Sequence, residues 1–190
     1  MPRTRVELDR EQKQAEILQA AERRLRADGY GALSIAGIAR ELGLAQAAVY
    51  WYFPSKDDLL VAAMRRMLGK IKARKPKDQH DVVEKILWFA DELAPIYPLR
   101  ATMKERARSS PVVAGFLEET TTMLRAMLSN VLSAHVRPAE LSLAVETFVT
   151  AVDGAYVRGL SPAERRRILR FTLERIIQRS DRKDSTRRSR

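Results

Sequence analysis

The chain has 190 residues, with 35 basic and 24 acidic side chains, a net charge of +11 and no cysteine. Its length suits one domain or two small ones, and the lack of cysteine excludes disulfides and thiolate metal sites. No apolar run reaches the ~18 residues of a membrane span and the N-terminus has no signal-peptide core, so we expect a cytoplasmic protein without a membrane partner.

Apolar residues recur every three or four positions, and no segment alternates with a period of two, so we expect an all-α fold. The expected helices cover residues 10–28, 35–42, 46–52, 56–75, 82–94, 99–108, 112–135, 138–158 and 162–179. Gly29, Gly43 and Gly159 are expected to end three of them, because glycine adopts the left-handed conformation readily. Ser34 and Ser55 precede others and can cap them.

Composition divides the chain into three expected parts. A charged, proline-containing segment at residues 70–79 marks a boundary between an N-terminal domain with its connecting helix and a larger helical domain. The expected ranges are 10–75 for the first domain, 76–179 for the second, and 180–190 for a basic disordered tail. The roles expected for these domains follow from the motifs and the resemblance described below.

Residues 29–60 carry the strongest functional signal. Two short amphipathic helices meet at Leu42-Gly43-Leu44, the arrangement that lets a second helix lie in a DNA major groove. The net charge is +6 over residues 1–75, +1 over 76–178 and +4 over 179–190, so positive charge is concentrated at the two ends. A basic N-terminal third fits a polyanionic partner, and a merely solvated surface is the alternative.

The second of these short helices is predicted to turn Val49 and Phe53, four residues apart, toward the core. The residues left to face outward at its front are Gln46, Ala47, Tyr50 and Trp51. Glutamine can read adenine, alanine can contact a thymine methyl, and a tyrosine hydroxyl can bond a phosphate oxygen. Ordinary core packing is the alternative for the aromatic run, which continues through Tyr52.

Lys56 is an unusual residue for the start of a helix. A cation beside the positive end of a helix dipole is unfavourable by roughly a few tenths of a kcal/mol. A phosphate held by both the lysine and the free backbone N–H groups reverses that sign. Lys56 is therefore a predicted phosphate contact.

Residues 16–64 resemble the DNA-binding domain of the TetR family of bacterial transcription regulators. The matching elements are Ile17-Leu18-x-Ala20-Ala21, Gly29-Tyr30, Leu33-Ser34-Ile35, Ile38-Ala39, Leu42-Gly43-Leu44, Val49-Tyr50-Trp51-Tyr52-Phe53 and Ser55-Lys56-Asp57-Asp58-Leu59. The resemblance implies an all-α homodimer, in which an N-terminal three-helix domain binds an operator and a larger helical domain binds a small ligand that usually releases DNA.

The resemblance also implies residue roles. Base or nearby backbone contacts fall on Gln46, Ala47, Tyr50 and Trp51, and phosphate contacts fall on Ser34, Tyr52 and Lys56. The chain departs from the family pattern at Ala45, where Ser or Thr commonly caps the recognition helix, and a poor cap costs about 1 kcal/mol. Ala47 and Ala48 offer no hydrogen bonds, so base readout is expected to depend on Gln46 and the aromatic residues.

The C-terminal half predicts an interface between subunits. The helix at 138–157 is apolar on nearly every face, so both of its sides are expected to be buried, one of them by a second subunit. The last helix has a broad apolar stripe, and two such helices from each chain would form a four-helix seam. A monomer core is the alternative for both helices.

Large apolar side chains suggest a ligand pocket in the same half. The candidates are Trp88, Phe89, Tyr97, Met103, Phe116, Met123 and Met127. Methionine adapts to varied ligands, although an aromatic or methionine stripe is more often plain core. Asp153 lies in the apolar helix, either facing a ligand or, as we favour, paired at the dimer seam.

No catalytic motif accompanies these features. The two histidines are far apart, and the chain has no glycine-rich phosphate loop, metal-binding spacing or nucleophile elbow, so we expect no enzyme, cofactor or metal. The favoured interpretation is a ligand-responsive, homodimeric repressor of transcription, released from an operator in double-stranded DNA by a small molecule. The alternatives are a basic architectural DNA-binding protein without a ligand, and a helical enzyme or carrier with a vestigial helix-turn-helix.

Overall fold

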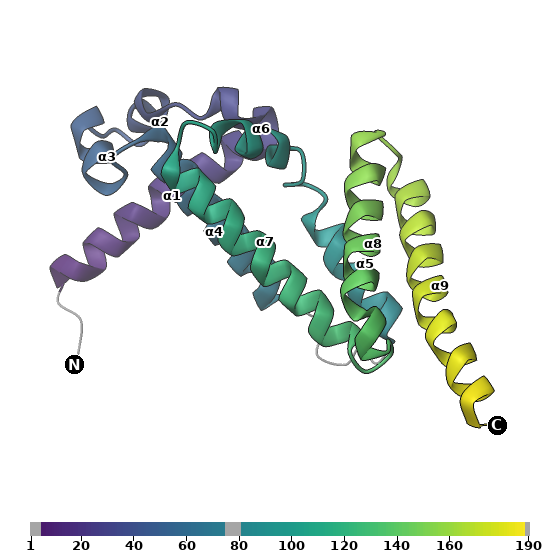
Figure 1. Cartoon of the computed structure of the whole chain (residues 1–190). Coiled ribbons are helices and arrows are strands. Elements are labelled where there is room, and N and C mark those ends of the chain that lie inside the picture. The colour runs from purple at the N-terminus through teal and green to yellow at the C-terminus, as the bar shows by residue number, and fades with distance from the viewer. Residues whose placement is uncertain (1–4, 75–80, 189–190) are drawn as a thin grey trace. The chain divides into compact units, whose positions relative to one another are not determined.

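The computed structural model describes residues 5–74 and 81–188, and in these ranges the chain forms nine α-helices and no strand (Figure 1). The helices are α1 (Arg5–Ala32), α2 (Ile35–Glu41), α3 (Gln46–Tyr52), α4 (Lys56–Ala73), α5 (Val82–Leu93), α6 (Leu99–Arg106), α7 (Pro111–Leu132), α8 (Pro138–Val157) and α9 (Pro162–Arg188). The all-α prediction is confirmed. No helix in the described ranges is both long enough and apolar enough to cross a membrane.

Helix ends lie where the local sequence places them. Gly29 has φ 70° and interrupts α1 as the predicted stop, and Gly43 and Gly159 both have φ 64° directly after α2 and α8. The Ser34 hydroxyl accepts a hydrogen bond from the backbone N–H of Gly37, which caps α2. A single sequence predicts such helix ends because they depend on glycine conformation and on hydrogen bonds between residues only a few positions apart.

The structure describes two compact units. The first contains α1 to α4, α6 and the first turns of α7, and the second contains α5, the rest of α7, α8 and α9. Residues 95–118, expected in the C-terminal domain, are grouped with the N-terminal helices. The reason is packing, because Leu99 and Met103 of α6 are buried and α6 contacts α1.

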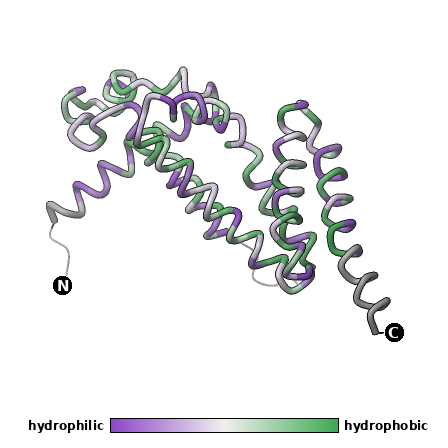
Figure 2. The backbone as a smooth tube through the Cα atoms, viewed as in Figure 1, coloured by the Kyte–Doolittle hydropathy of each residue, from purple (hydrophilic) through white to green (hydrophobic). Residues whose placement is uncertain are grey.

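The core of the first unit is built by α1 and α4. Ile17 and Leu25 of α1 and Leu60, Met67 and Ile71 of α4 are all buried, and the two helices pack on each other. Burying each such side chain contributes about 1.5–3 kcal/mol. Hydrophilic residues predominate over the N-terminal part of α1 that precedes this core (Figure 2).

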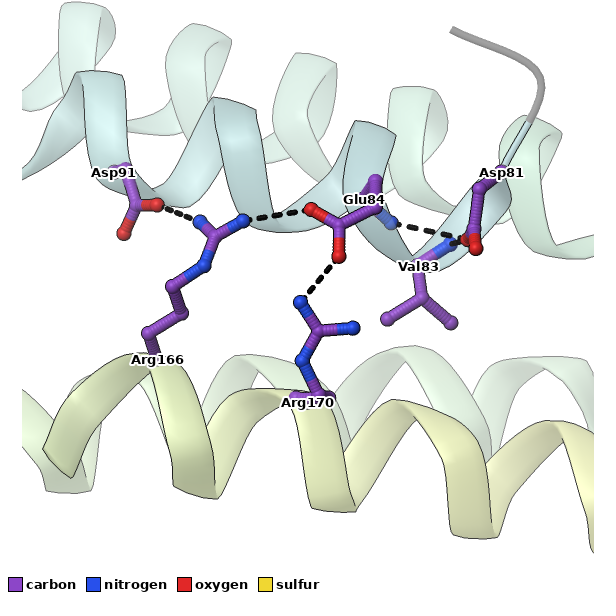
Figure 3. A network of polar contacts seen from close by, with 6 residues as sticks. All are labelled: Asp81, Val83, Glu84, Asp91, Arg166 and Arg170. Atoms are coloured by element: carbon purple, nitrogen blue, oxygen red, sulfur yellow. Dashed lines mark hydrogen bonds and ion pairs between the residues drawn. The ribbon is translucent and has the colours of Figure 1, made fainter. Parts of the chain in front are cut away.

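The core of the second unit joins α5, α8 and α9 through Leu87, Phe148, Leu169 and Leu173. Ion pairs at the edge fix α9 against α5. Arg166 of α9 pairs with both Glu84 and Asp91, and Arg170 pairs with Glu84 (Figure 3). Asp81 caps α5 by accepting hydrogen bonds from the backbone N–H groups of Val83 and Glu84 (Figure 3).

Helix α9 continues as far as Arg188, so most of the segment expected to be a disordered tail is helical. No glycine or proline follows Pro162 in this helix, and nothing in the local sequence therefore ends it near residue 179. The start is a capping box, because Ser161 and Glu164 exchange hydrogen bonds between their side chains and backbone N–H groups.

Candidate nucleic-acid interface

Helices α2 and α3 form the predicted helix-turn-helix and pack on each other. The turn is closed by a 2.8 Å hydrogen bond from the backbone N–H of Leu44 to the carbonyl of Ala39. Gly43 provides the left-handed residue that this reversal needs. The α2 side is held to α1 by Arg24, which donates to the Gly37 carbonyl at 3.2 Å and to Glu41 at 2.8 Å.

Helix α3 buries one side and exposes the other. Val49 and Phe53 are buried at 0% and 3% exposure, as the spacing predicts. Tyr50 is 44% exposed and Trp51 is 62% exposed, so neither belongs to the core of this chain. The remaining residues predicted to face outward, Gln46 and Ala47, are also exposed. The structure thus brings all four predicted readout residues onto one accessible surface.

The three residues predicted to contact phosphates lie at helix ends: Ser34 before α2, Tyr52 at the end of α3 and Lys56 at the start of α4. Ser34 is exposed, and accepting from Gly37 leaves its hydroxyl hydrogen available for another acceptor. Tyr52, the last residue of α3, packs edge to face on Trp51 with ring centroids 4.8 Å apart. Ala45 makes no side-chain cap to α3, so this departure from the family pattern leaves the N-terminal N–H groups of α3 without that acceptor.

Lys56 is the first residue of α4, after the cap Ser55, as predicted. Its ammonium lies 4.0 Å from the centroid of the Tyr30 ring, a cation–π contact that the sequence did not reveal. Burial and the nearby Arg106 guanidinium lower the pKa of the Lys56 amine. The ring therefore holds the lysine at the start of α4, where a phosphate would meet both the ammonium and the first backbone N–H groups.

A buried polar network supports this end of α4. Asp57 is 7% exposed, and its carboxylate accepts hydrogen bonds from Arg106 at 2.6 and 3.1 Å and from the Tyr30 hydroxyl at 2.8 Å. The Arg106 guanidinium lowers the pKa of Asp57, while burial and Asp57 raise the pKa of Tyr30 to about 12. Arg106 comes from α6, so the network ties α1, α4 and α6 together.

Sequence reasoning missed this network because its parts are far apart. Asp57 was visible as an acidic residue in the first turn of a helix, a position that suits the helix dipole. Arg106 lies 49 residues later, and nothing in the local pattern of α6 indicates a carboxylate partner.

Comparison with known proteins agrees with this geometry. The profile of "Bacterial regulatory proteins, tetR family" matches residues 17–63. A curated relative, the HTH-type transcriptional regulator BetI of Rhizobium meliloti (strain 1021), is 28% identical over 75% of this chain and 75% of its own length. Residues 17–63 therefore match the helix-turn-helix DNA-binding segment of the tetR family, and the chain is similar over three quarters of its length to a transcriptional regulator.

Solved structures share the fold of this chain. A transcriptional regulator from Rhodococcus sp. Rha1 is 21% identical, with a TM-score of 0.74 over 88% of this chain and 97% of that one. A protein from Saccharomonospora viridis, solved in complex with choline, is 19% identical, with a TM-score of 0.73 over 86% of this chain and 96% of that one. Both comparisons extend over the second unit, which the family profile does not cover.

The predicted ligand residues are divided between the two units of the chain. Tyr97, Met103 and Phe116 belong to the first unit, and Trp88, Phe89, Met123 and Met127 belong to the second. The Trp88 and Phe89 ring centroids are 6.4 Å apart. Asp153 of α8 is half-buried, and burial raises the pKa of its carboxyl group.

Proposed function

We propose that this chain is a repressor that binds operator DNA as a homodimer and leaves it when a small molecule binds. The observation that carries the proposal is the α3 surface, where Tyr50 and Trp51 are exposed while Val49 and Phe53 anchor the helix. Two large aromatic rings exposed on one short helix do not stabilise the fold, and such an exposed patch indicates an interaction site. In this proposal DNA covers both rings. Repression is the mode that requires only occupancy of the operator.

The seven predicted DNA-contact residues divide into three groups in this proposal. Gln46 and Ala47 stand at the N-terminal end of α3, the end that contacts base edges in a helix-turn-helix. Gln46 would bond an adenine, and Ala47 would meet a thymine methyl group. The hydroxyl groups and the cation at the edges, from Ser34, Tyr52 and Lys56, would bind phosphates, and Tyr50 and Trp51 would pack between these two sets.

The exposed apolar side chains of α8 and α9 support the homodimer. In the second unit Leu143 is 67% exposed, Phe171 is 59% exposed and Val157 is 86% exposed. Leu143 and Val157 are 14 residues apart, four helical turns, so they lie on one stripe of α8. A second copy of α8 and α9 would cover these side chains in a four-helix seam.

The choline complex of the Saccharomonospora viridis protein supports a small-molecule effector for this chain. Aromatic rings attract organic cations through their quadrupole, and the adjacent Trp88 and Phe89 rings are the strongest such candidates in the second unit. Met123 and Met127, the other predicted pocket residues of the second unit, stay part of the proposal. Titrating the operator complex with choline and with a neutral analogue, in which carbon replaces the nitrogen, tests whether a cation is the effector.

Footprinting with the full chain on the DNA that flanks its own gene tests the proposal as a whole. We expect two protected half-sites on one face of the duplex, separated by about 34–36 Å or a multiple of it. Uniform protection without sequence preference would instead establish an architectural DNA-binding protein. A protein that binds no DNA even at low salt would be a helical enzyme or carrier.

A further inference from the structure

Arg10 lies against the exposed face of the recognition helix. Its guanidinium carbon is 4.5 Å from the centroid of the Trp51 ring, although the two residues are 41 positions apart. Arg10 is exposed, and Trp51 remains 62% exposed with the guanidinium in place. Tyr52 also contacts this ring, edge to face. Arg10 and Tyr52 thus both pack on Trp51 at the surface of the first unit.

Stacking leaves the hydrogen-bonding capacity of the arginine unused. A cation–π contact uses the charge of the guanidinium and does not consume its five N–H donors, which match the geometry of a phosphate. Among the residues whose side chains the structure describes, no carboxylate forms an ion pair with Arg10. Glu16, six residues further along α1, is bonded to Lys13. The charge at the edge of the recognition surface is thus held in place without being neutralised there.

The position of Trp51 within α3 indicates which part of the DNA this charge would meet. Trp51 is the second-last residue of α3, whereas the N-terminal end of a recognition helix contacts the base edges. The C-terminal end of such a helix lies toward the rim of the groove, where phosphates are the available acceptors. A basic group stacked there is placed for the backbone beside the half-site.

We propose that Arg10 is a further DNA-contact residue, which binds a backbone phosphate at the flank of each half-site while its stacking holds Trp51 against the duplex. The proposal rests on the proposed function, because it requires that α3 bind DNA. It gives the N-terminal part of α1 a role beyond packing, and it makes Arg10 a source of affinity rather than of base preference.

The salt dependence of operator binding tests the phosphate contact. Arg10→Ala is compared with Arg26→Ala, which removes the same charge from another exposed position of α1, 16 residues away or about 24 Å along the helix. We expect Arg10→Ala to reduce the slope of log affinity against log salt by about 1 per subunit, with unchanged base preference, and Arg10→Lys to keep the slope. Equal slopes for Arg10→Ala and Arg26→Ala would overturn the proposal.

Fluorescence tests the stacking without any DNA. Trp51 and Trp88 are the only tryptophans, so Trp88→Phe makes Trp51 the sole reporter. In that background we expect Arg10→Ala to make Trp51 more accessible to a neutral quencher, whereas Arg26→Ala should not. Unchanged quenching in Arg10→Ala would overturn the stacked arrangement. A wild-type protein that protects no operator would instead refute the proposed function. The quenching experiment uses no DNA, so it would still report on the Arg10–Trp51 contact in that case.

Discussion

Replacing Asp57 by asparagine should weaken the fold and DNA binding together, although Asp57 is buried and is not one of the proposed DNA contacts. The carboxylate is 7% exposed and accepts bonds from Arg106 and Tyr30. Asparagine has the same shape, but its amide presents N–H donors where one carboxylate oxygen accepted from the guanidinium. One partner group therefore loses its acceptor inside the first unit.

The size of the effect follows from these contacts. A hydrogen bond to a charged group contributes about 1.5–3 kcal/mol, and Asp57 accepts three of them. Arg106 is 38% exposed, so water can rehydrate part of the guanidinium after the change. We therefore expect a loss of unfolding free energy equal to about one such bond, ~1.5–3 kcal/mol, rather than the sum of three.

Urea unfolding at fixed protein concentration measures this loss, and its pH dependence separates charge from shape. The folded pKa of Asp57 is lowered by Arg106, so its contribution is present above the ordinary value of 3.8 and disappears as pH falls through the lower folded value. The difference between wild type and Asp57→Asn should be constant near neutrality and should shrink below 3.8. The matched control is Asp28→Asn at an exposed site, which should change stability by at most about 0.5 kcal/mol. A difference in unfolding free energy between wild type and Asp57→Asn that does not change with pH would refute the reasoning.

Three further outcomes follow from the same structure. Gln46→Ala should cost about 1–3 kcal/mol on the operator and relax preference at one base position per half-site, and an unchanged preference in a binding-site selection would remove Gln46 as a reader. Phe171→Asp should give a monomer in sedimentation, whereas the same change at exposed Val112 in the first unit should leave the dimer intact; a dimeric Phe171→Asp protein would place the interface elsewhere. Absorbance titration should show one tyrosine with a pKa of about 12, and this transition should be absent from Tyr30→Phe. If Tyr30→Phe instead lacks a tyrosine of ordinary pKa, the Tyr30–Asp57 hydrogen bond is not formed in solution.

The sequence was sufficient for the features that depend on near neighbours. Helix ends at Gly29 and Ser34 and the inward direction of Val49 follow from rules that span three or four residues, and the structure confirms them. The helix-turn-helix was predictable for the same reason, since its turn and its apolar spacing are local. The resemblance to the family added an expected role for each exposed residue.

Contacts across long separations were beyond the reach of the sequence. Arg106 meets Asp57 and Arg10 meets Trp51 only because folded helices bring them together, and a solvated charge on a helix surface has the same local pattern as a paired one. The grouping of α6 with the first unit was missed for this reason, because its buried residues look the same in sequence whichever helix they pack against.

Helix α6 also suggests how an effector signal would reach DNA. In the chain α6 lies between two segments of the second unit, yet Arg106 pairs with the first turn of α4, beside Lys56. A ligand can release DNA only to the extent that it prefers the released state, a coupling of about 5–150-fold, and operator must weaken ligand binding by the same factor. If α6 carries this coupling, Arg106→Gln should still bind operator, but the effector should then weaken operator binding less. By the same reciprocity, operator should weaken effector binding less. Calorimetry of an effector with and without operator, on wild type and Arg106→Gln, measures the factor directly. An undiminished factor in the variant would show that the coupling passes outside the Arg106–Asp57 pair, through α4 or α7.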